Sequence, residues 1–425
     1  MTTPVSQPQR HPLRVFGIVA VAAVLLIAAS QWKSVFTYFL KSKAIRQASQ
    51  AQMKEALECA RRAREYSPED AEVLLLVCRL ERQSGLLQES EVTIEALQSL
   101  GVPETRIQHE RHLTAARSGD LESAEPFLPQ LLASDELDSQ DVCEAFVIGY
   151  RTRFRIDESR TLAEVWKKDY PQDFRPYAHV ALIAQMATDW GRAVEEFQKA
   201  VDYGDRRAET LVSLGLCCLE INELDRGIKS FQLCTELYPE NADGWLGLAD
   251  SQSRLGMNQE SARSYDQCLK LDPYCFEAEL ARSRLLLVER KAEQAAESLG
   301  ALVQRWPEDT RALFQYGQAL SALGKTSESS EIAARWKIAD HETELMEQLL
   351  TKLQGEPQNV ALRCQIGVMM MKHYSRPMAV QFLSSVLLEE PGNIAAHASL
   401  ADYYQKRGQT DLAEKHRTFF GSNEL

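Results

Sequence analysis

The stretch LYPENADGWLGLADSQSRLG, Leu237–Gly256, has a proline shortly before a run of helix-forming residues and a glycine at its end. The same proline position recurs at Pro273 and again, after an equal interval, at Pro307. A fixed period of about 34 residues is typical of a stacked array of supersecondary units. The repeat therefore predicts the architecture of most of the chain.

The proline marker continues in both directions. Equal steps back from Pro239 give Asp205 and then Pro171, and Pro357 and Pro391 are separated by the same interval. Before Pro171 the steps fall close to other residues and the pattern is weaker. We therefore expect regular units after Pro171 and degenerate ones before it.

Each unit has the pattern of two helices. Nine and ten residues after the marker, a larger apolar residue precedes a small one, as Leu214 precedes Gly215, and the small side chain lets two helices approach closely. Seventeen residues after the marker stand residues that favour the left-handed conformation that ends a helix: Asn222, Gly256, Gly324 and Gly408. A second apolar helical pattern follows, and the next proline ends it.

These units resemble tetratricopeptide repeats. One unit matches the family pattern at Trp245, Leu248, Gly256, Tyr265 and Pro273, and another at Tyr177, Ala193, Phe197 and Ala200. The resemblance covers most of residues 50–425. It implies an all-α fold, a right-handed superhelical solenoid of helix-turn-helix units.

One break in the register is expected to divide the array. The interval from Pro307 to Pro357 is about one and a half units, and the surplus reads as an amphipathic helix through Leu345, Leu349 and Leu353. It is either a longer second helix with a linker helix packed on the solenoid, or an insertion that contacts a ligand.

The expected segments follow from the repeat and from the amino-terminal composition. They are a short basic tail of cytoplasmic type (1–14), a transmembrane helix or signal anchor (15–32), a juxtamembrane helical segment with a first half-repeat (33–70), degenerate repeats (71–170), regular repeats (171–336), the extra helix (337–356) and carboxy-terminal repeats (357–425).

The amino-terminal segment predicts a single-pass membrane anchor. Residues 15–32 are 18 uncharged residues, about 27 Å as a helix, close to the thickness of a bilayer core. Aromatic and basic residues suited to the membrane interface follow: Trp32, Lys33, Tyr38, Lys41, Lys43 and Arg46. A short tail without acidic residues favours the solenoid on the extracytoplasmic side. Charge by itself leaves both orientations open, because Arg10, Arg14 and the amino terminus roughly match the four basic residues after the segment. The alternative is a signal peptide cleaved after Ser30, which would release a secreted or periplasmic binding protein.

Charge and cysteine content exclude other classes. The chain has 48 basic and 61 acidic residues, and because its first 50 residues hold six basic and no acidic ones, residues 51–425 carry −19. So acidic a body disfavours nucleic acid, while the basic lead segment suits anionic lipid. The nine scattered cysteines include no CxxC pair and are expected to be buried thiols.

No motif predicts catalysis. Residues Ala319–Thr326 fit a permissive phosphate-loop pattern, but its first glycine is replaced by Ala319 and the preceding residues are helical. His109 and His112 have no third metal ligand placed by spacing. We therefore predict no enzyme, no cofactor, no metal and no small-molecule substrate.

The family resemblance implies a concave groove, lined by the first helices, that receives peptide partners. The residues expected to contact a partner are Val212, Leu246, Asp250, Arg254, Leu280, Arg284, Arg311 and Phe314. They combine an apolar stripe with arginines that steer acidic groups, and they lack the Lys and Asn of family members that clamp a partner's carboxyl terminus. The alternative is that they only pack between neighbouring helices.

Together these features predict a membrane-anchored scaffold or assembly factor whose partners are proteins or peptides. A regulatory subunit of a separate membrane enzyme is a further alternative. The sequence identifies neither the partner nor the oligomeric state.

Overall fold

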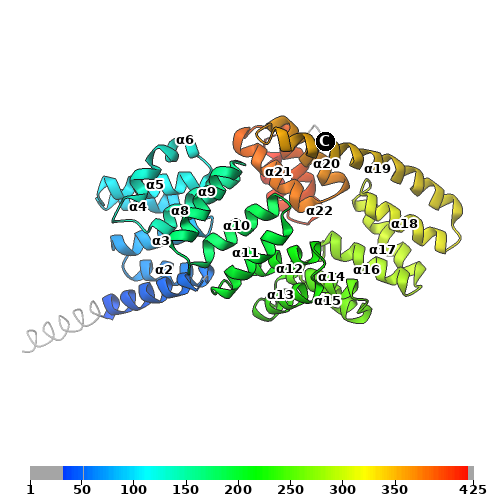
Figure 1. Ribbon diagram of the computed structural model, residues 1–425, viewed down its shortest axis with the longest axis horizontal. Helices are drawn as coiled ribbons and strands as arrows, with labels where there is room; N and C mark the ends of the chain where they lie inside the picture. Colours follow the sequence, from blue (N-terminus) through cyan, green and yellow to red (C-terminus); the bar gives the residue numbers. More distant parts are fainter. Residues whose placement is uncertain (1–31, 51, 420–425) are drawn as a thin grey trace, which may run out of the picture. The chain divides into compact units, whose positions relative to one another are not determined.

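The computed structural model describes residues 32–50 and 52–419, and within this part of the chain all regular secondary structure is helical (Figure 1). This confirms the all-helical solenoid. The predicted membrane segment, residues 15–32, lies outside the described residues except for Trp32. Within residues 32–50 and 52–419, no helix combines the length and the apolar character needed to cross a bilayer.

Two compact units divide the chain, Met1–Ala145 and Phe146–Leu425. In the first unit a helix over residues 32–49 is followed by α2 (Met53–Tyr66), α3 (Ala71–Gln83), α4 (Leu87–Ser99), α5 (Glu104–Ser118), α6 (Leu121–Ala124), the 3₁₀ helix η1 (Glu125–Phe127), α7 (Leu128–Leu132) and the start of α8 (Ser139–Thr152). The short pieces α6 to α7 hold Pro126 and Pro129, which interrupt what would otherwise be one second helix.

The second unit holds the regular pairs. These are α9 (Ile156–Asp169), α10 (Phe174–Met186), α11 (Trp190–Asp202), α12 (Ala208–Glu220), α13 (Leu224–Leu237), α14 (Ala242–Arg254), α15 (Asn258–Leu271), α16 (Phe276–Val288), α17 (Ala292–Arg305), α18 (Thr310–Ala322), α19 (Thr326–Gly355), α20 (Val360–His373), α21 (Arg376–Glu389), α22 (Ile394–Lys406) and α23 (Thr410–Arg417). Consecutive helices pack on each other, and first helices also contact the first helix of the next unit, as α12 contacts α14 and α16 contacts α18.

Several first helices begin at a side-chain cap two residues after the marker proline. Two residues after Pro239, the Asn241 side chain caps α14 by accepting a hydrogen bond from Gly244 N at 2.7 Å. Side-chain caps at the same offset from other marker prolines are Asp70, Asp173, Asp309, Asn359 and Asn393. A cap of this kind satisfies backbone donors that the first turn leaves free. The Pro-x-Asp/Asn pattern is therefore a further sequence signal for these helix starts.

In most units the turn between the two helices holds one residue in the left-handed conformation. The turn between α20 and α21 is an exception, since Tyr374 has φ −140° there. The predicted residues are confirmed in the left-handed conformation, including Asn222 at φ 60° and Gly256 at φ 75°. Non-glycine residues hold the same conformation at Phe154, Thr188 and Arg290, with φ between 56° and 60°. Backbone hydrogen bonds close the turn at Arg290, whose N–H donates to Leu287 O at 3.0 Å. The regular spacing thus extends back to Phe154, where the sequence match is weak.

Small residues in the first helices make room for large ones in the second. The ring of Phe231 in α13 is fully buried between α12 and α14. A Cβ placed on Gly215 would lie 2.5 Å from Phe231 Cζ, and one placed on Gly247 would lie 2.0 Å from Phe231 Cε1. The close approach predicted at Gly215 is therefore real, and it depends on the absence of a side chain.

The surplus residues after Pro307 continue a second helix. α19 is one helix of 30 residues and leads from α18 to α20 (Figure 1). Its buried residues recur every seven positions, at Ile332, Ala339, Met346 and Leu353. Of the three residues predicted to form the apolar face, Leu353 lies in this seam and Leu349 is partly buried against the same cluster, whereas Leu345 is 43% exposed. A seam whose residues recur every seven positions drifts slowly around a straight helix. The predicted face instead rested on residues four positions apart, which do not show this drift.

Candidate protein-binding face and an internal clasp

The first helices α12, α14 and α16 present part of the predicted partner surface. We call this surface the first-helix face and define it by five side chains, of which the first three are half-buried and the last two more open to solvent: Val212, Leu246, Asp250, Arg254 and Arg284. The apolar residues come from α12 and α14, and the charged ones extend through α14 to α16. The face therefore combines an apolar part with a charged part.

Asp250 is the charged centre of the first-helix face. Its Oδ1 accepts a hydrogen bond from the Tyr265 hydroxyl at 2.5 Å. Burial raises the pKa of Asp250, and the Tyr265 hydrogen bond and the charges of Arg284 and Arg254 oppose this shift. Arg254 also donates to Leu219 O at 2.8 Å, which holds its guanidinium across to α12. A hydrogen bond from the helix that follows thus fixes the acid in position, and the charges of two neighbouring arginines favour its ionised form.

The other three predicted residues have neighbours in later helices of the chain. Leu280 is 7% exposed and belongs to an apolar cluster that continues through α18, α20 and α22. Arg311 donates to Tyr374 O at 2.7 Å. The ring of Phe314 lies 5.9 Å from that of Trp336 in α19, the helix that directly follows, and Phe314 is 50% exposed. The carboxy-terminal helices therefore engage Leu280 and Arg311, whereas Phe314 stays open to solvent.

These contacts belong to an arrangement that we call the internal clasp. It joins the starts of α16 and α18 to helices α20–α22 and the turn after α22. Its members are Asp272, Phe276, Trp306, Glu308 and Asp309 on one side, and His373, Arg376 and Arg407 on the other.

Arg376, the first residue of α21, is the centre of the internal clasp. Its guanidinium carbon lies 3.9 Å from the centroid of the Phe276 ring and 4.1 Å from that of Trp306. Its Nη2 forms an ion pair with Asp309 Oδ2 at 2.9 Å. Burial lowers the pKa of Arg376, and the charge of Asp309 opposes that shift. Two aromatic faces and one carboxylate therefore take the place of water around the planar cation.

Asp309 serves two functions in the internal clasp. Its Oδ1 caps α18 by accepting from the backbone N–H groups of Arg311 and Ala312, both at 3.0 Å. Its Oδ2 pairs with Arg376 at 2.9 Å and with Arg311 at 3.0 Å. The cap that starts α18 is thus also the anion that holds α21.

A second ion pair and a close approach extend the internal clasp to the end of the chain. Arg407, which follows α22, pairs with Asp272, which precedes α16. At Gly408 the backbone is so close to Tyr274 that a Cβ would lie 3.0 Å from its ring. The last unit therefore packs against the turn that opens the α16 unit.

The carboxy-terminal helices also contact the turn between α8 and α9, close to the start of the second compact unit. The Phe154 ring lies 6.0 Å from that of Phe382 and 5.0 Å from the guanidinium carbon of Arg363. The Gln358 side chain donates to Phe154 O at 3.2 Å. Helices α20 and α21 therefore contact both the α8–α9 turn and the start of α18.

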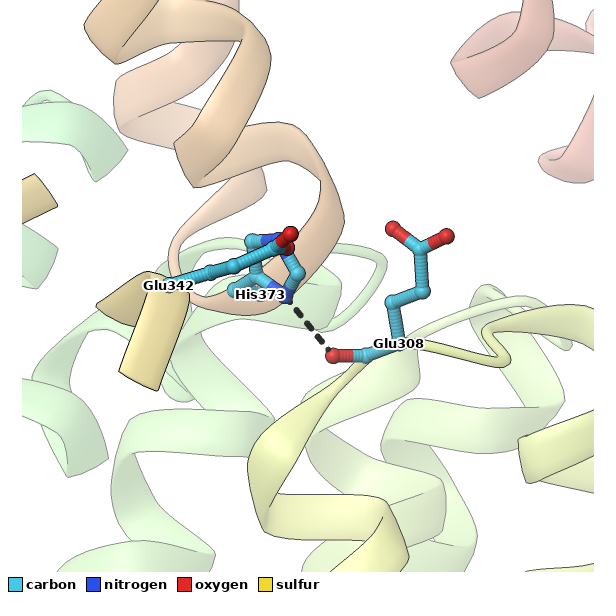
Figure 2. Close-up of side chains that lie close together, drawn as sticks. All are labelled: Glu308, Glu342 and His373. Atoms are coloured by element: carbon cyan, nitrogen blue, oxygen red, sulfur yellow. Dashed lines mark hydrogen bonds and ion pairs between the residues drawn. The ribbon is translucent and has the colours of Figure 1, made fainter. Parts of the chain in front are cut away.

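Two members of the internal clasp, Glu308 and His373, form a group with the Glu342 carboxylate. His373 ends α20 and is 1% exposed, Glu342 comes from α19, and Glu308 precedes α18. One ligand atom from each lies within 4.8 Å of the others. Figure 2 shows the Glu342 carboxylate beside the imidazole and the Glu308 carboxylate directed away from it.

His112 and the phosphate-loop pattern singled out in the sequence have other structural explanations. The ring of His112 stacks on Phe127 at 3.9 Å, and burial lowers the pKa of His112. Residues 319–326 run from the end of α18 into α19, with Gly324 in the left-handed turn between them. The helix before this turn differs from the strand that a phosphate loop follows.

The cysteines are buried free thiols, as predicted. Burial raises the pKa of Cys217 to about 12 and that of Cys218 to about 11. A thiol in this state packs as a small apolar side chain.

The sequence could not predict the internal clasp. Asp309 and Arg376 are separated in the sequence by the whole of α18, α19 and α20, and no sequence motif links the two residues. The one available signal was the break in register after Pro307, which moves the later units out of line with the earlier ones.

Comparisons with known proteins agree with this architecture. Residues 208–241 and 242–275 each match a model of the tetratricopeptide repeat, and residues 280–340 match another. No curated protein matches the chain in sequence.

Several solved structures are similar to part of the chain. One is described as the functional characterization of Pseudomonas aeruginosa pilF, with 19% identity, a TM-score of 0.41, and coverage of 47% of this chain and 89% of that one. Another is YrrB, described as a TPR protein with an unusual peptide-binding site, with 14% identity, a TM-score of 0.40, and coverage of 44% and 96%. A third is MamA from Desulfovibrio magneticus RS-1, with 14% identity, a TM-score of 0.37, and coverage of 40% and 95%.

These identities and TM-scores are too low to carry a functional conclusion. The repeat matches and the paired helices indicate the same architecture. The described part of the chain is all-helical and carries tetratricopeptide repeats over residues 208–275 and 280–340.

Proposed function

We propose that this protein is a membrane-tethered interaction scaffold that binds an apolar or amphipathic segment of a partner protein on the first-helix face. The face presents half-buried Val212 and Leu246 beside the more open Arg254 and Arg284. Apolar anchors surrounded by charged groups are the usual composition of a protein-binding site. Stacked repeats support such a role because each unit contacts its neighbours and leaves one side of the array available.

The single observation that carries this proposal is the contrast along the first helices. Leu280 and Arg311 are engaged by the carboxy-terminal part of the chain. Val212 and Leu246 instead belong to apolar clusters that are formed by residues between α10 and the end of α16. This contrast supports a partner site on α12, α14 and the exposed side of α16.

The membrane tether is a separate part of the proposal. It rests on the 18 uncharged residues 15–32 and on the basic residues that follow them. The side of the membrane is proposed from the short tail without acidic residues, which favours an extracytoplasmic array. Extraction of membranes with alkaline carbonate, together with amino-terminal sequencing of the mature chain, tests the tether. A soluble chain that begins at Gln31 would contradict it.

Site-specific photo-crosslinking tests the partner site. A photoreactive amino acid at Leu246 should crosslink to a partner in intact cells, and mass spectrometry identifies the product. The same amino acid at Leu237 is the control, because Leu237 is 47% exposed but ends the second helix α13. Substitution of Leu246 by Glu should then abolish co-purification of the identified partner without loss of helicity. Equal crosslinking at both positions would refute the assignment to the first-helix face.

A further inference from the structure

Glu308, Glu342 and His373 bring ligand atoms from three separate elements to one place. Glu308 lies in the turn before α18, Glu342 in the middle of α19, and His373 at the end of α20. The histidine is the buried member, whereas the Glu308 and Glu342 side chains are 49% and 48% exposed. The group therefore has a fixed nitrogen on the inside and two movable carboxylates at the surface.

The hydrogen bond of His373 Nδ1 determines which ring nitrogen has a free lone pair. Nδ1 lies 2.9 Å from the backbone carbonyl oxygen of Glu308, as the dashed line in Figure 2 shows. A carbonyl oxygen only accepts, so Nδ1 carries a proton and donates it. In the neutral imidazole, Nε2 is then the unprotonated nitrogen. This is the arrangement that orients metal-binding histidines, whose other nitrogen donates to a carbonyl or carboxylate.

The surroundings of Nε2 call for a cation. Nε2 lies 2.6 Å from Glu342 Oε2, but it is buried and the contact lacks the alignment of a hydrogen bond. A neutral imidazole nitrogen and a carboxylate oxygen are both acceptors, so they repel at this distance unless a positive charge lies between them. A bound metal ion supplies that charge and satisfies the lone pair.

We propose that His373 Nε2 and the carboxylates of Glu342 and Glu308 bind a divalent transition-metal ion of the zinc class. One imidazole and two carboxylates suit Zn²⁺ and its neighbours, whereas Mg²⁺ and Ca²⁺ take oxygen ligands only. Glu308 is the ligand that must turn inward, because its carboxylate extends away from the ring and pairs with Lys372 at 3.4 Å.

Such an ion would fasten the internal clasp. Its three ligands join α19 and α20 to the turn that precedes α18, and Arg376 and Asp309 lie close to two of them in the sequence. Metal binding should therefore stabilise the docking of the carboxy-terminal helices. This inference is independent of the proposed partner and of the membrane tether.

Titration of the full-length chain tests the site. The chain is solubilised in detergent, treated with a chelator and titrated with Zn²⁺ in a calorimeter, and Co²⁺ is used in parallel for its visible absorption. We expect one ion per chain and an increase in the thermal unfolding temperature. Glu342→Gln should weaken binding by about 10-fold or more, since glutamine has a similar size but lacks the negative charge of the ligand. The control is Glu344→Gln on the same helix, because Glu344 is 69% exposed and pairs with the surface His341.

The main rival explanation is a protonated His373 paired directly with Glu342. It predicts no saturable Zn²⁺ binding by the wild-type chain, and that result would overturn the proposal. Equal affinity of the wild type and the Glu342→Gln variant, or Co²⁺ absorption typical of thiolate ligands, would also overturn it. His373→Asn should abolish binding; if that variant does not fold, Glu342→Gln and Glu308→Gln decide, because both side chains are half-exposed.

Discussion

Arg376 Nη2 lies 2.9 Å from Asp309 Oδ2, and both side chains are withdrawn from solvent, with 2% and 0% of the side chain exposed. This ion pair joins the start of α21 to the start of α18. Because a buried charge is costly without its partner, the pair makes the docking of the carboxy-terminal helices specific to one arrangement. The same carboxylate caps α18, so the docking and the helix start depend on each other.

Arg376→Met tests the contribution of the pair. We expect the variant to lose about 3 kcal/mol of stability, because the aromatic contacts are weakened and Asp309 keeps only the partly exposed Arg311 as an ion-pair partner. Thermal or urea unfolding followed by circular dichroism measures the change. The exposed Lys372→Met should differ from the wild type by no more than about 0.5 kcal/mol. Equal losses in the two variants would show that the buried pair does not hold the clasp.

The left-handed turn at Thr188 should be improved by glycine. Thr188 has φ 57°, a conformation that is strained for a β-branched residue and free for glycine. We expect Thr188→Gly to raise stability by about 1 kcal/mol. The reciprocal change, Gly256→Ala at φ 75° with no atom near the new Cβ, should lower it by a similar amount. Opposite signs in the two unfolding curves are the expected result, and a loss in both would contradict it.

A methyl group at Gly247 should damage the packing of α13 against α14. The added Cβ would lie 2.0 Å from the Phe231 ring, which is fully buried. We expect Gly247→Ala to cost about 1–3 kcal/mol. Combining it with Phe231→Leu should recover part of that loss, because the smaller side chain leaves room for the methyl. Strictly additive losses in the double variant would argue against a steric cause.

Asp250 should make stability depend on pH in a defined direction. Burial raises the pKa of Asp250 above its usual 3.8, so the folded chain holds this proton more tightly than the unfolded chain does. Its contribution is therefore complete below about 3.8 and is lost as the pH rises through the folded pKa. Asp250→Asn should match the wild type in acid and become more stable than it towards neutral pH. A wild type that is the more stable one at neutral pH would show that the arginines outweigh burial.

The sequence by itself determined the repeating helices. A helix begins and ends through local chemistry, and the marker prolines, the Asp or Asn caps after them and the turn at Gly256 all act within a few residues. The packing of Gly215 against a large neighbour was predictable for the same reason, because the small residue recurs at a fixed place in each unit.

Only the tertiary structure decided where the later units dock. Three helices, α18 to α20, separate Arg376 from Asp309 in the sequence, so no local pattern could name this partner. The neighbours of Leu280 and Arg311 were equally unpredictable. Their repeat positions suggested a partner groove, but the structure shows that they contact the carboxy-terminal part of the chain. Local periodicity fixes the elements, whereas contacts between distant elements depend on the whole path of the chain, here redirected by the 30 residues of α19.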